Sequence, residues 1–501
     1  MKNLSAFEKK ILLLGLIAHI IAAWFSIGFH HPDEHYQIVE FANYKLGSPL
    51  TPLSKLAWEY PAQIRPGLQP YMAYIALKAY YAAGFSDPYN FAFLLRLISG
   101  LAGFLTAFAF HKAMAPQLKS DLMRRVHLVL SVLGWGLVYI HVRFSSENWA
   151  AMAFAWALIF LWDEKNRNRY LLFGFMGGLS MVFRFQAIFM LGGAGLWMLF
   201  SDRTKFRNIA NVFAGFLVAF AIGLCFERWL YGTWTVSGWS YVEQNIFHNK
   251  AAYYGVSPWY WYFTEILKEA LFPFSIIMLL SIFIVPVARP RHILSWIMPV
   301  FFLGHMVVAH KEFRFLWPLE FFYPFFAITT IEYLHERFKK HHEQKGYKRS
   351  VKLLRNAFWV VNAATLLLMI TKPANDLLAL NQKIFRHIAK PTIVIYSKEF
   401  NPYINGDTLG ATFYSNPLIE SYCIDEVMND TNKLRGKNVW LFSEYRYPSE
   451  EFIFQYAGPF FDSSKAEVIW RRLPTWTYKL NFNGWVDRSN PYTLYELNTS
   501  K

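Results

Sequence analysis

Two short charged motifs lie far apart in the chain, and each directly abuts an apolar segment long enough to span a bilayer. The first is HPDE at His31–Glu34 and the second is HKEFR at His310–Arg314. Charged side chains are costly beside a membrane segment unless they face a protein interior or water, so their presence there points to function. A carboxylate can take a proton from a hydroxyl group, and a cluster of cations can bind an anion. We therefore interpret the two motifs as halves of one active site.

The HPDE segment has the features of a helix start, with Pro32 in the first turn and Asp33 and Glu34 near the positive end of the helix dipole. Acidic first turns are also ordinary capping, so this placement alone does not indicate catalysis. Helical spacing would set a polar stripe along one face, suited to sugar hydroxyls. The stripe consists of Asp33, Gln37, Glu40 and Tyr44. His31 and His35 lack the HExxH pattern of a zinc site, which makes metal ligation the less favoured interpretation.

In the HKEFR segment, Lys311 and Arg314 can share a helical face and form an anion site. Arg314 offers a planar fork for phosphate oxygens, and Lys311 and His310 add charge or donors. The alternative is structural, because Glu312 can pair with one of these cations and anchor a helix end. Arg184 stands between two apolar runs, where it could supplement the cluster or equally extend to the membrane interface.

The composition indicates a membrane protein. Of the 501 residues, 54% are hydrophobic, 19% are aromatic and only 17% are charged, against about 25% charged in soluble domains. The net charge of +16 arises mostly from Lys and Arg in short loops between apolar runs, which favours positive-inside topology over nucleic-acid binding. Cys225 lies in an apolar run and Cys423 in the polar tail, so no disulfide and no zinc site are expected.

The apolar runs predict a mainly α, polytopic membrane bundle of about eleven transmembrane helices, several of them shorter than the ~20 residues of a perpendicular span. The predicted spans are Ile11–Phe29, Asn90–Phe110, Val126–Val142, Trp149–Trp162, Tyr170–Phe183, Gln186–Ser201, Ile209–Phe226, Leu271–Val287, Ile293–Ala309, Phe315–Ile331 and Leu354–Ile370. The first span runs directly into HPDE, so we interpret it as an uncleaved anchor. Tyr71–Phe85 is short and contains Lys78, and we expect it to lie in the membrane interface.

This register places 22 Lys and Arg residues in the inside loops and 9 in the short outside loops, with the amino terminus inside. Both charged motifs, the WEYPAQIR stretch, SSEN at 145–148, Arg184 and the 227–258 loop then fall on the outside. The basic segment 335–352 falls inside, where a solvated tether is the favoured interpretation. One face of the membrane therefore collects nearly every unusual polar residue.

The polar carboxyl-terminal part of the chain predicts an extramembrane α/β domain. We expect a transmembrane catalytic domain at 1–371, with 30–86 as its first external loop, and an external domain at 372–501. The predicted strands of the external domain are Thr392–Tyr396, Val439–Phe442, Glu467–Trp470, Tyr478–Phe482 and Tyr492–Leu497.

Three segments resemble glycosyltransferase family 22, the polyprenyl-phosphate-mannose-dependent mannosyltransferases of the C-type glycosyltransferase superfamily. HPDEHYQIVEFANYKLG at His31–Gly47 resembles the family's first external loop motif. WEYPAQIRPGLQP at Trp58–Pro70 is similar to the segment that follows it, with Pro66 where Ser is usual. HKEFRFLWP at His310–Pro318 resembles the second signature. The tyrosine-rich loop that begins at Glu227 is a weaker match, with Glu227 at a position where the family commonly has Asp. The tail of the chain lacks the Cys-His-Ser-Thr-Pro pattern of several eukaryotic members.

The resemblance, which covers roughly residues 8–335, implies a C-type glycosyltransferase fold and an inverting transfer of mannose. The donor would be a polyprenyl-phosphate-linked sugar, and the acceptor a lipid-linked or surface glycan on the external face. Asp33 would be the general base, and Glu34 would orient the acceptor or substitute as base. The residues expected to bind the donor phosphate are His310, Lys311, Arg314 and Arg184. The residues expected to line the rest of the substrate pocket are His31, Gln37, Trp58, Glu59, Arg65 and Glu312.

No Asp-x-Asp motif occurs in the chain. A nucleotide diphosphate would need a divalent ion between such carboxylates, whereas a lipid monophosphate can be neutralised by Arg314 and Lys311. We therefore expect metal-independent transfer with no cofactor and no nucleic-acid partner. The expected location is a bacterial inner membrane with a periplasmic active site, and the alternative is the endoplasmic reticulum membrane with a lumenal one.

Two other classes of protein remain as alternatives. A polyprenyl-linked saccharide transporter or flippase would show broken helices and inverted repeats. The sequence has no such duplication, and GFMGG at 174–178 is more simply close helix packing. An O-antigen-type ligase would differ from a family 22 enzyme in using a diphosphate-linked donor.

Overall fold

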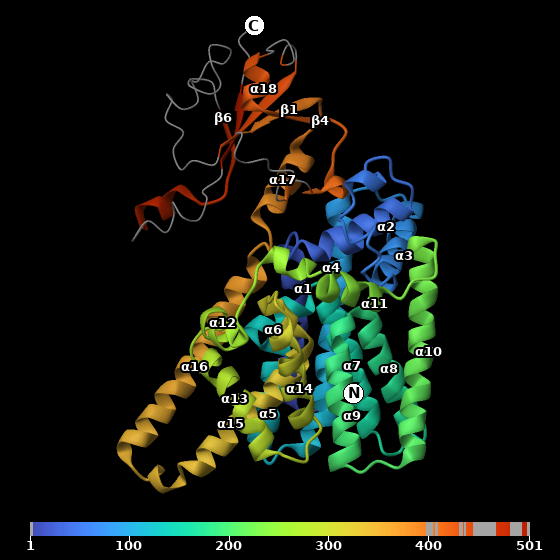
Figure 1. Cartoon of the computed structure of the whole chain (residues 1–501). Helices are drawn as coiled ribbons and strands as arrows, with labels where there is room; N and C mark the ends of the chain where they lie inside the picture. Colours follow the sequence, from blue (N-terminus) through green and yellow to red (C-terminus); the bar gives the residue numbers. More distant parts are fainter. Residues whose placement is uncertain are drawn as a thin grey trace. The chain divides into compact units, whose positions relative to one another are not determined.

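Figure 1 shows the computed structural model, which describes residues 4–396, 404–405, 409–429, 434, 437–443, 467–480 and 493–497. The chain forms two compact units. The first contains Met1–Leu46, Ala57–Ser86 and Asn90–Lys372, and the second contains Gly47–Leu56, Asp87–Tyr89 and Pro373–Lys501. Part of the predicted first external loop thus groups with the second unit, where Thr51 Oγ1 lies 2.7 Å from Thr412 Oγ1.

The described part of the first unit is built from helices. Its α-helices are α1 Ala6–Phe25, α2 Glu40–Lys45, α3 Leu68–Ala82, α4 Pro88–Met114, α5 Asp121–Leu133, α6 Trp135–His141, α7 Ser146–Trp162, α8 Arg169–Phe183, α9 Ile188–Leu196, α10 Phe206–Tyr231, α11 Ser237–Val242, α12 Trp261–Glu269, α13 Phe274–Ala288, α14 Leu294–Val307, α15 Tyr323–Arg337 and α16 Lys345–Thr371. The 3-10 segments are η3 Ala115–Gln117, η4 Phe185–Ala187, η7 Lys250–Tyr254, η8 Phe313–Phe322 and η9 Lys339–His341, and the π-helical segments are η1 His35–Val39, η5 Trp197–Ser201 and η6 Glu243–Phe247.

Close backbone approach joins α8 to α10, which Figure 1 shows side by side. A Cβ on Gly174 would lie 1.9 Å from the carbonyl oxygen of Val212, and a Cβ on Gly215 would lie 2.1 Å from that of Leu171. In lipid, helices associate through such small-residue packing, because the bilayer removes the hydrophobic driving force. The GFMGG segment therefore serves helix packing, as its spacing predicts.

Among the described residues, three helical segments are long and apolar enough to cross a membrane: Pro88–Gln117, Phe206–Tyr231 and Lys345–His387. The pair α5 and α6, bent by 46°, would make a fourth if it is one broken span. Shorter apolar helices occupy Arg169–Phe183, Phe185–Ser201, Phe274–Ala288 and Leu294–Val307. Each of the eleven predicted spans overlaps helical structure, and their number stays a prediction.

The predicted span Phe315–Ile331 differs most from the structure. Its first eight residues belong to the 3-10 helix η8, and α-helix begins only at Tyr323. Pro318 lies inside η8 and Pro324 in the first turn of α15, and each proline removes a backbone donor that an α-helix would use. This break matters because η8 carries Arg314.

The second unit contains a five-stranded sheet of order β4-β1-β5-β7-β6. Its strands are β1 Thr392–Tyr396, β4 Ile419–Cys423, β5 Asn438–Ser443, β6 Glu467–Arg471 and β7 Thr493–Leu497. Strand β1 pairs in parallel with β4 and β5, whereas β7 pairs antiparallel with β5 and β6. Two short strands, β2 Ile404–Asn405 and β3 Leu409–Gly410, form a separate pair. The helices of this unit are η2 Leu53–Lys55, α17 Asp376–His387, η10 Thr412–Tyr414, α18 Ile424–Asn429 and η14 Thr475–Leu480.

Four of the predicted strands coincide with β1, β5, β6 and β7. The prediction of a strand at Tyr478–Phe482 is wrong for its described part, because Thr475–Leu480 forms the 3-10 helix η14. Pro474 starts a turn there, in which the Thr477 N–H donates to its carbonyl oxygen. Residues 481–482 lie outside the described part of the chain. Strand β4 was not predicted, since Glu420 and Ser421 interrupt its apolar pattern.

Candidate active site

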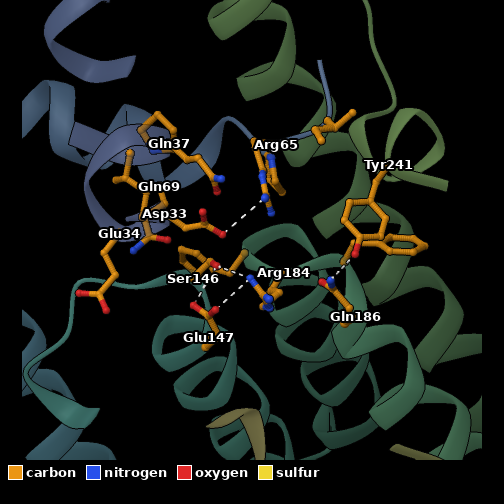
Figure 2. A pocket seen from close by; sticks show the side chains of 16 residues that line it. Asp33, Glu34, Gln37, Arg65, Gln69, Ser146, Glu147, Arg184, Gln186 and Tyr241 are labelled. Carbon is orange, nitrogen blue, oxygen red and sulfur yellow. Dashed lines mark hydrogen bonds and ion pairs between the residues drawn. The ribbon is translucent and has the colours of Figure 1, made fainter. Parts of the chain in front are cut away.

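A cavity of about 400 Å³ in the first unit brings most of the predicted site residues together. Its lining comes from the two charged motifs, the WEYPAQIR stretch, the start of η4 and the 227–258 loop. The charged and imidazole side chains that line it are His31, Asp33, Glu59, Arg65, Arg184, His310, Glu312 and Arg314. A smaller adjoining cavity, drawn in Figure 2, shares Asp33, Arg65 and Arg184 with it.

The first motif does not continue as a regular α-helix. The carbonyl oxygen of Pro32 accepts hydrogen bonds from two backbone N–H groups, and residues His35–Val39 then form the π-helix η1. A π-helical turn is wider than an α turn and is frequent at functional sites. Because of it, the predicted polar stripe is divided: Gln37 Nε2 donates to Glu59 at 2.9 Å, whereas Glu40 pairs with His35 at 2.9 Å.

Asp33 is held between two arginines. Its Oδ2 lies 2.7 Å from Arg314 Nη2 and 3.5 Å from Arg65 Nη2. Burial opposes ionisation of the carboxyl, but the two guanidinium groups outweigh it and hold the pKa of Asp33 well below its ordinary value. Asp33 is therefore an ionised carboxylate at neutral pH, and it joins the first motif to the second.

Arg314 is the centre of the charge cluster, because it contacts carboxylates from three different segments. Its Nε and Nη2 bind Glu312 in a fork, at 2.6 and 3.1 Å, and Nη2 also reaches Asp33. Nη1 pairs with Glu147 in the first turn of α7. Glu312 therefore tethers Arg314, as the structural alternative for the HKEFR motif expects. Arg314 also lines the cavity, and its role in binding an anion stays a prediction.

Glu147 is a charged residue of this cluster to which the sequence assigned no role. Its Oε1 accepts from both Arg314 and Arg184, the latter at 3.1 Å. Arg184 follows the end of α8 in extended conformation, donates to Ser146 Oγ at 3.1 Å and stacks on the Phe315 ring. The only sequence signal for Glu147 is an acidic first turn on an apolar helix, which reads as ordinary capping.

The WEYPAQIR stretch adds a second charged pair. Arg65 Nη2 lies 3.5 Å from Glu59 Oε1, the oxygen that also accepts from Gln37. Burial raises the pKa of Glu59, and Arg65 opposes that shift. Trp58 lines the cavity with its ring stacked on Tyr254, at 6.4 Å between centroids.

The residues of the second motif contact different partners, and they do not all line the cavity. His310 Nε2 lies 3.0 Å from Glu312 Oε1, and His31 Nε2 from the first motif lies 3.1 Å from Glu312 Oε2. Lys311 does not line the cavity, because its ammonium donates to the carbonyl oxygens of Ser257, at 3.0 Å, and Val308, at 2.6 Å. The expectation that Lys311 shares a face with Arg314 is therefore corrected: loop carbonyls hold it instead.

Glu34 points away from Asp33, as Figure 2 shows, and lines only the smaller of the two cavities. Its Oε2 lies 4.0 Å from Arg143 Nη1, and its Oε1 has no hydrogen-bond partner among the described residues. Burial raises the pKa of Glu34 to about 7, although Arg143 opposes the shift. The two adjacent carboxyl groups therefore differ strongly in proton affinity.

This difference predicts a pH-dependent stability. The native state keeps the Glu34 proton up to about pH 7, whereas the unfolded state loses it near the ordinary glutamate pKa of 4.5. Glu34 therefore lowers stability as pH rises through that window. Glu34→Gln should stabilise the protein by about 3 kcal/mol at pH 8 and have little effect at pH 4.5. Unfolding in detergent across this range tests it, with exposed Glu164→Gln as the control. An effect of Glu34→Gln that is independent of pH would contradict the assignment.

Among solved structures, ArnT from Cupriavidus metallidurans in the apo state aligns with a TM-score of 0.48 at 10% identity, over 97% of each chain. The Archaeoglobus fulgidus oligosaccharyltransferase complex with Zn and sulfate aligns with a TM-score of 0.46 at 12% identity, over 82% of this chain and 62% of that one. At TM-scores below 0.5, these likenesses carry no argument about this chain.

Curated relatives match part of the chain. GPI mannosyltransferase 3 of Candida albicans is 24% identical over 294 residues, 58% of this chain and 57% of the relative. Mannosyltransferase APTG1 of Arabidopsis thaliana is 21% identical over 322 residues, 62% of this chain and 56% of the relative. GPI alpha-1,2-mannosyltransferase 3 of Homo sapiens is 22% identical over 295 residues, 58% of this chain and 51% of the relative. The chain thus spans about half the length of these relatives.

A family-level match covers much more of the chain. The model of the Alg9-like mannosyltransferase family matches residues 10–404, a range that contains both charged motifs and every residue of the two cavities. This match confirms the resemblance drawn from HPDE and HKEFR. The chain therefore belongs to the Alg9-like mannosyltransferase family.

Proposed function

We propose that the protein is a membrane-embedded mannosyltransferase that moves mannose from a polyprenyl-phosphate-linked donor to a glycan acceptor. The observation that carries the proposal is the contact of 2.7 Å between Asp33 Oδ2 and Arg314 Nη2, in a cavity that both line. A carboxylate that can take a proton and a cationic group that can hold an anion are thereby side by side. Membership of the family favours this reaction over transport and over transfer from a lipid diphosphate.

The donor phosphate would bind beside the three arginines of the cavity. These arginines differ in how many of their N–H groups already donate to protein acceptors. Arg314 already donates to three carboxylates. Arg184 donates only through Nη1 among the described residues, and its Nε has no partner there; Arg65 Nε likewise has none. We therefore assign the phosphate oxygens mainly to Arg184 and Arg65, with Arg314 holding Asp33 beside them.

This assignment predicts a donor-binding defect in Arg184→Ala. Loss of the charged hydrogen bonds to the phosphate should lower kcat/KM for the donor by roughly 10- to 100-fold, mainly through KM. Kinetics at varied donor concentration measure the effect. Arg184→Lys is the matched variant: it keeps the charge but loses the planar fork, so it should recover only part of the loss. An unchanged donor KM in Arg184→Ala would exclude this role.

Transfer would proceed by in-line attack with inversion. The acceptor hydroxyl gives its proton to Asp33 while its oxygen bonds to the anomeric carbon of mannose. The bond from that carbon to the phosphate oxygen breaks, and its electron pair stays on the lipid phosphate. The two arginines make Asp33 a weak base, but an anionic phosphate beside Arg65 and Arg314 would offset part of their charge and raise its proton affinity. Glu34 in the adjoining cavity is the alternative base.

The acceptor and the membrane location are inferred from the remaining cavity residues and from the relatives. Trp58 and Glu59, which line the larger cavity, and Gln37, which lines the smaller one and donates to Glu59, would contact sugar hydroxyls. The names of the GPI mannosyltransferase relatives suggest a mannose-bearing glycolipid as acceptor. These relatives are eukaryotic, so they give no support to a bacterial inner membrane, and the endoplasmic reticulum alternative fits them. In either membrane, the active site would lie on the external or lumenal face.

A comparison of donors tests the proposal. Purified protein is given mannose on a polyprenyl monophosphate, on a polyprenyl diphosphate or on a nucleoside diphosphate, with a mannose-terminated glycolipid as acceptor. We expect product only from the monophosphate donor, since the cavity offers guanidinium groups and lacks a paired Asp-x-Asp for a metal-bound diphosphate. Equal product from the nucleotide sugar would refute the proposed donor.

A further inference from the structure

A row of alternating carboxylate and imidazole groups leads away from Asp33 along the cavity wall. His31 Nδ1 lies 3.4 Å from Asp33 Oδ1, and His31 Nε2 lies 3.1 Å from Glu312 Oε2. The other oxygen of Glu312 meets His310 Nε2 at 3.0 Å. Each of the two motifs thus supplies one carboxylate and one imidazole to the row.

His31 is placed to hold a proton and to release it. Its Nδ1 can accept from the backbone N–H of Asp33, at 3.3 Å, when it is unprotonated, and can donate to Asp33 Oδ1 when it is protonated. Both protonation states of the ring therefore have a partner. The side chain is 31% exposed, compared with 19% for Asp33. The ring of His31 therefore reaches both Asp33 and solvent.

Asp33 needs a neighbouring base to which it can pass the proton that it takes from the acceptor. During transfer, the acceptor hydroxyl must lie against the carboxylate, and the donor phosphate lies beside its arginine partners, so the substrates themselves cover the cavity side of Asp33. The two arginines also favour the ionised carboxylate, which makes the neutral acid a good proton donor to a neighbouring base. His31, on the other oxygen of Asp33, is that neighbour.

We propose that His31 is a proton relay: it takes from Asp33 the proton that came from the acceptor hydroxyl and releases it to water, with Glu312 orienting its ring. The inference rests on the proposed function. The proton passes from Asp33 Oδ1 to His31 Nδ1, which restores the carboxylate and forms an imidazolium. The imidazolium then loses one proton to solvent or to a buffer base. No oxidant, metal or further reactant takes part.

Glu312 fits the role of the positioning residue. Its carboxylate contacts the imidazoles of His31 and His310 and the guanidinium of Arg314, and these three contacts fix its orientation. Burial opposes ionisation of its carboxyl, but the hydrogen bond from His310 and the charge of Arg314 outweigh burial and lower its pKa. A permanently ionised carboxylate at Nε2 fixes the ring and stabilises the imidazolium, as in a Ser-His-Asp arrangement. The pKa of His310 is raised, mainly by its hydrogen bond to Glu312.

The chain contains a matched control in the preceding residue. His30 is an exposed histidine whose Nδ1 lies 3.1 Å from the hydroxyl of Tyr139 and whose ring packs on Trp317. It belongs to the same loop and has the same chemistry, yet it lies outside the lining of the cavity. A general loss of loop structure would affect both histidines, whereas a relay role singles out His31.

Chemical rescue tests the inference on the full-length protein in detergent. His31→Ala should lower kcat about 10- to 100-fold with little change in donor KM, and added imidazole should restore turnover to a saturating level. His30→Ala should lose much less kcat than His31→Ala, and added imidazole should not change its turnover. His31→Gln, which keeps a polar side chain, is the second variant in case the alanine variant does not fold.

Three outcomes are distinguishable. Rescue by imidazole in either His31 variant supports the relay. Full turnover in both His31 variants, or a loss that imidazole does not restore and that appears in donor KM, overturns the relay and makes His31 at most a substrate contact. Wild-type protein that transfers no mannose from any lipid monophosphate donor overturns the proposed function itself, and the relay with it.

Discussion

Asp33→Asn is expected to lower mannose transfer by about 10²- to 10⁴-fold, the range for loss of a general base. Asparagine has nearly the same shape, so the residue still fits between Arg314 and Arg65, but an amide cannot take the hydroxyl proton. Steady-state transfer with saturating donor and acceptor measures the loss. Donor binding should persist or strengthen, because one anionic group that competes with the phosphate for the arginines is gone.

Glu34→Gln is the matched control for this prediction. Like Asp33→Asn, it replaces a carboxyl group by an amide. Glu34, however, faces Arg143 and the smaller cavity rather than Arg314. Transfer should fall far less than in Asp33→Asn. A large loss in Glu34→Gln with normal turnover in Asp33→Asn would contradict the assignment and make Glu34 the base.

Arg314→Ala is expected to destabilise the protein by about 3–5 kcal/mol, besides abolishing transfer. The substitution leaves Asp33, Glu147 and Glu312 close together without their shared counter-charge, in a site where Arg314 is only 4% exposed. These carboxylates come from the first loop, from α7 and from the residues before η8, so their repulsion acts between segments that Arg314 now joins. Thermal or denaturant unfolding in detergent measures the loss.

A second substitution checks the cause of that instability. If repulsion between carboxylates is responsible, Glu147→Gln in the Arg314→Ala background should recover part of the lost stability, so the two effects are not additive. Arg314→Lys should retain more stability than the alanine variant, because it keeps the charge while it loses the fork to Glu312. Full stability of Arg314→Ala would show that the cluster is not held by this arginine.

The sequence predicted the convergence of the two motifs but only part of its geometry. Apolar runs beside HPDE and HKEFR restrict where charge can go, and this restriction is enough to bring Asp33 and Arg314 to one cavity. The position of Lys311 depends on the carbonyl oxygens of Ser257 and Val308, which no local pattern reveals. Glu147 was missed for a similar reason, since its partners come from distant segments.

Local backbone geometry accounts for the other differences. The π-helical turn at His35–Val39 divides the polar stripe that regular α spacing predicts from Asp33 to Tyr44. Two prolines convert the start of one predicted span into the 3-10 helix η8. In the second unit, β4 has exposed polar residues at its centre and could be recognised only through its parallel pairing with β1. Hydropathy reports burial well, but it does not report how a helix is wound.

Transfer of labelled mannose by purified wild-type protein in the presence of EDTA tests the central claim most directly. The donor is polyprenyl-phosphate-mannose and the acceptor is a mannose-terminated glycolipid. The arrangement of Asp33 beside Arg314, Arg184 and Arg65 predicts label in the glycolipid, one lipid phosphate released for each mannose moved, and the same rate with and without EDTA. Protein that binds the donor but leaves the mannose on it, or transfer that stops with EDTA and returns with a divalent ion, would contradict this account.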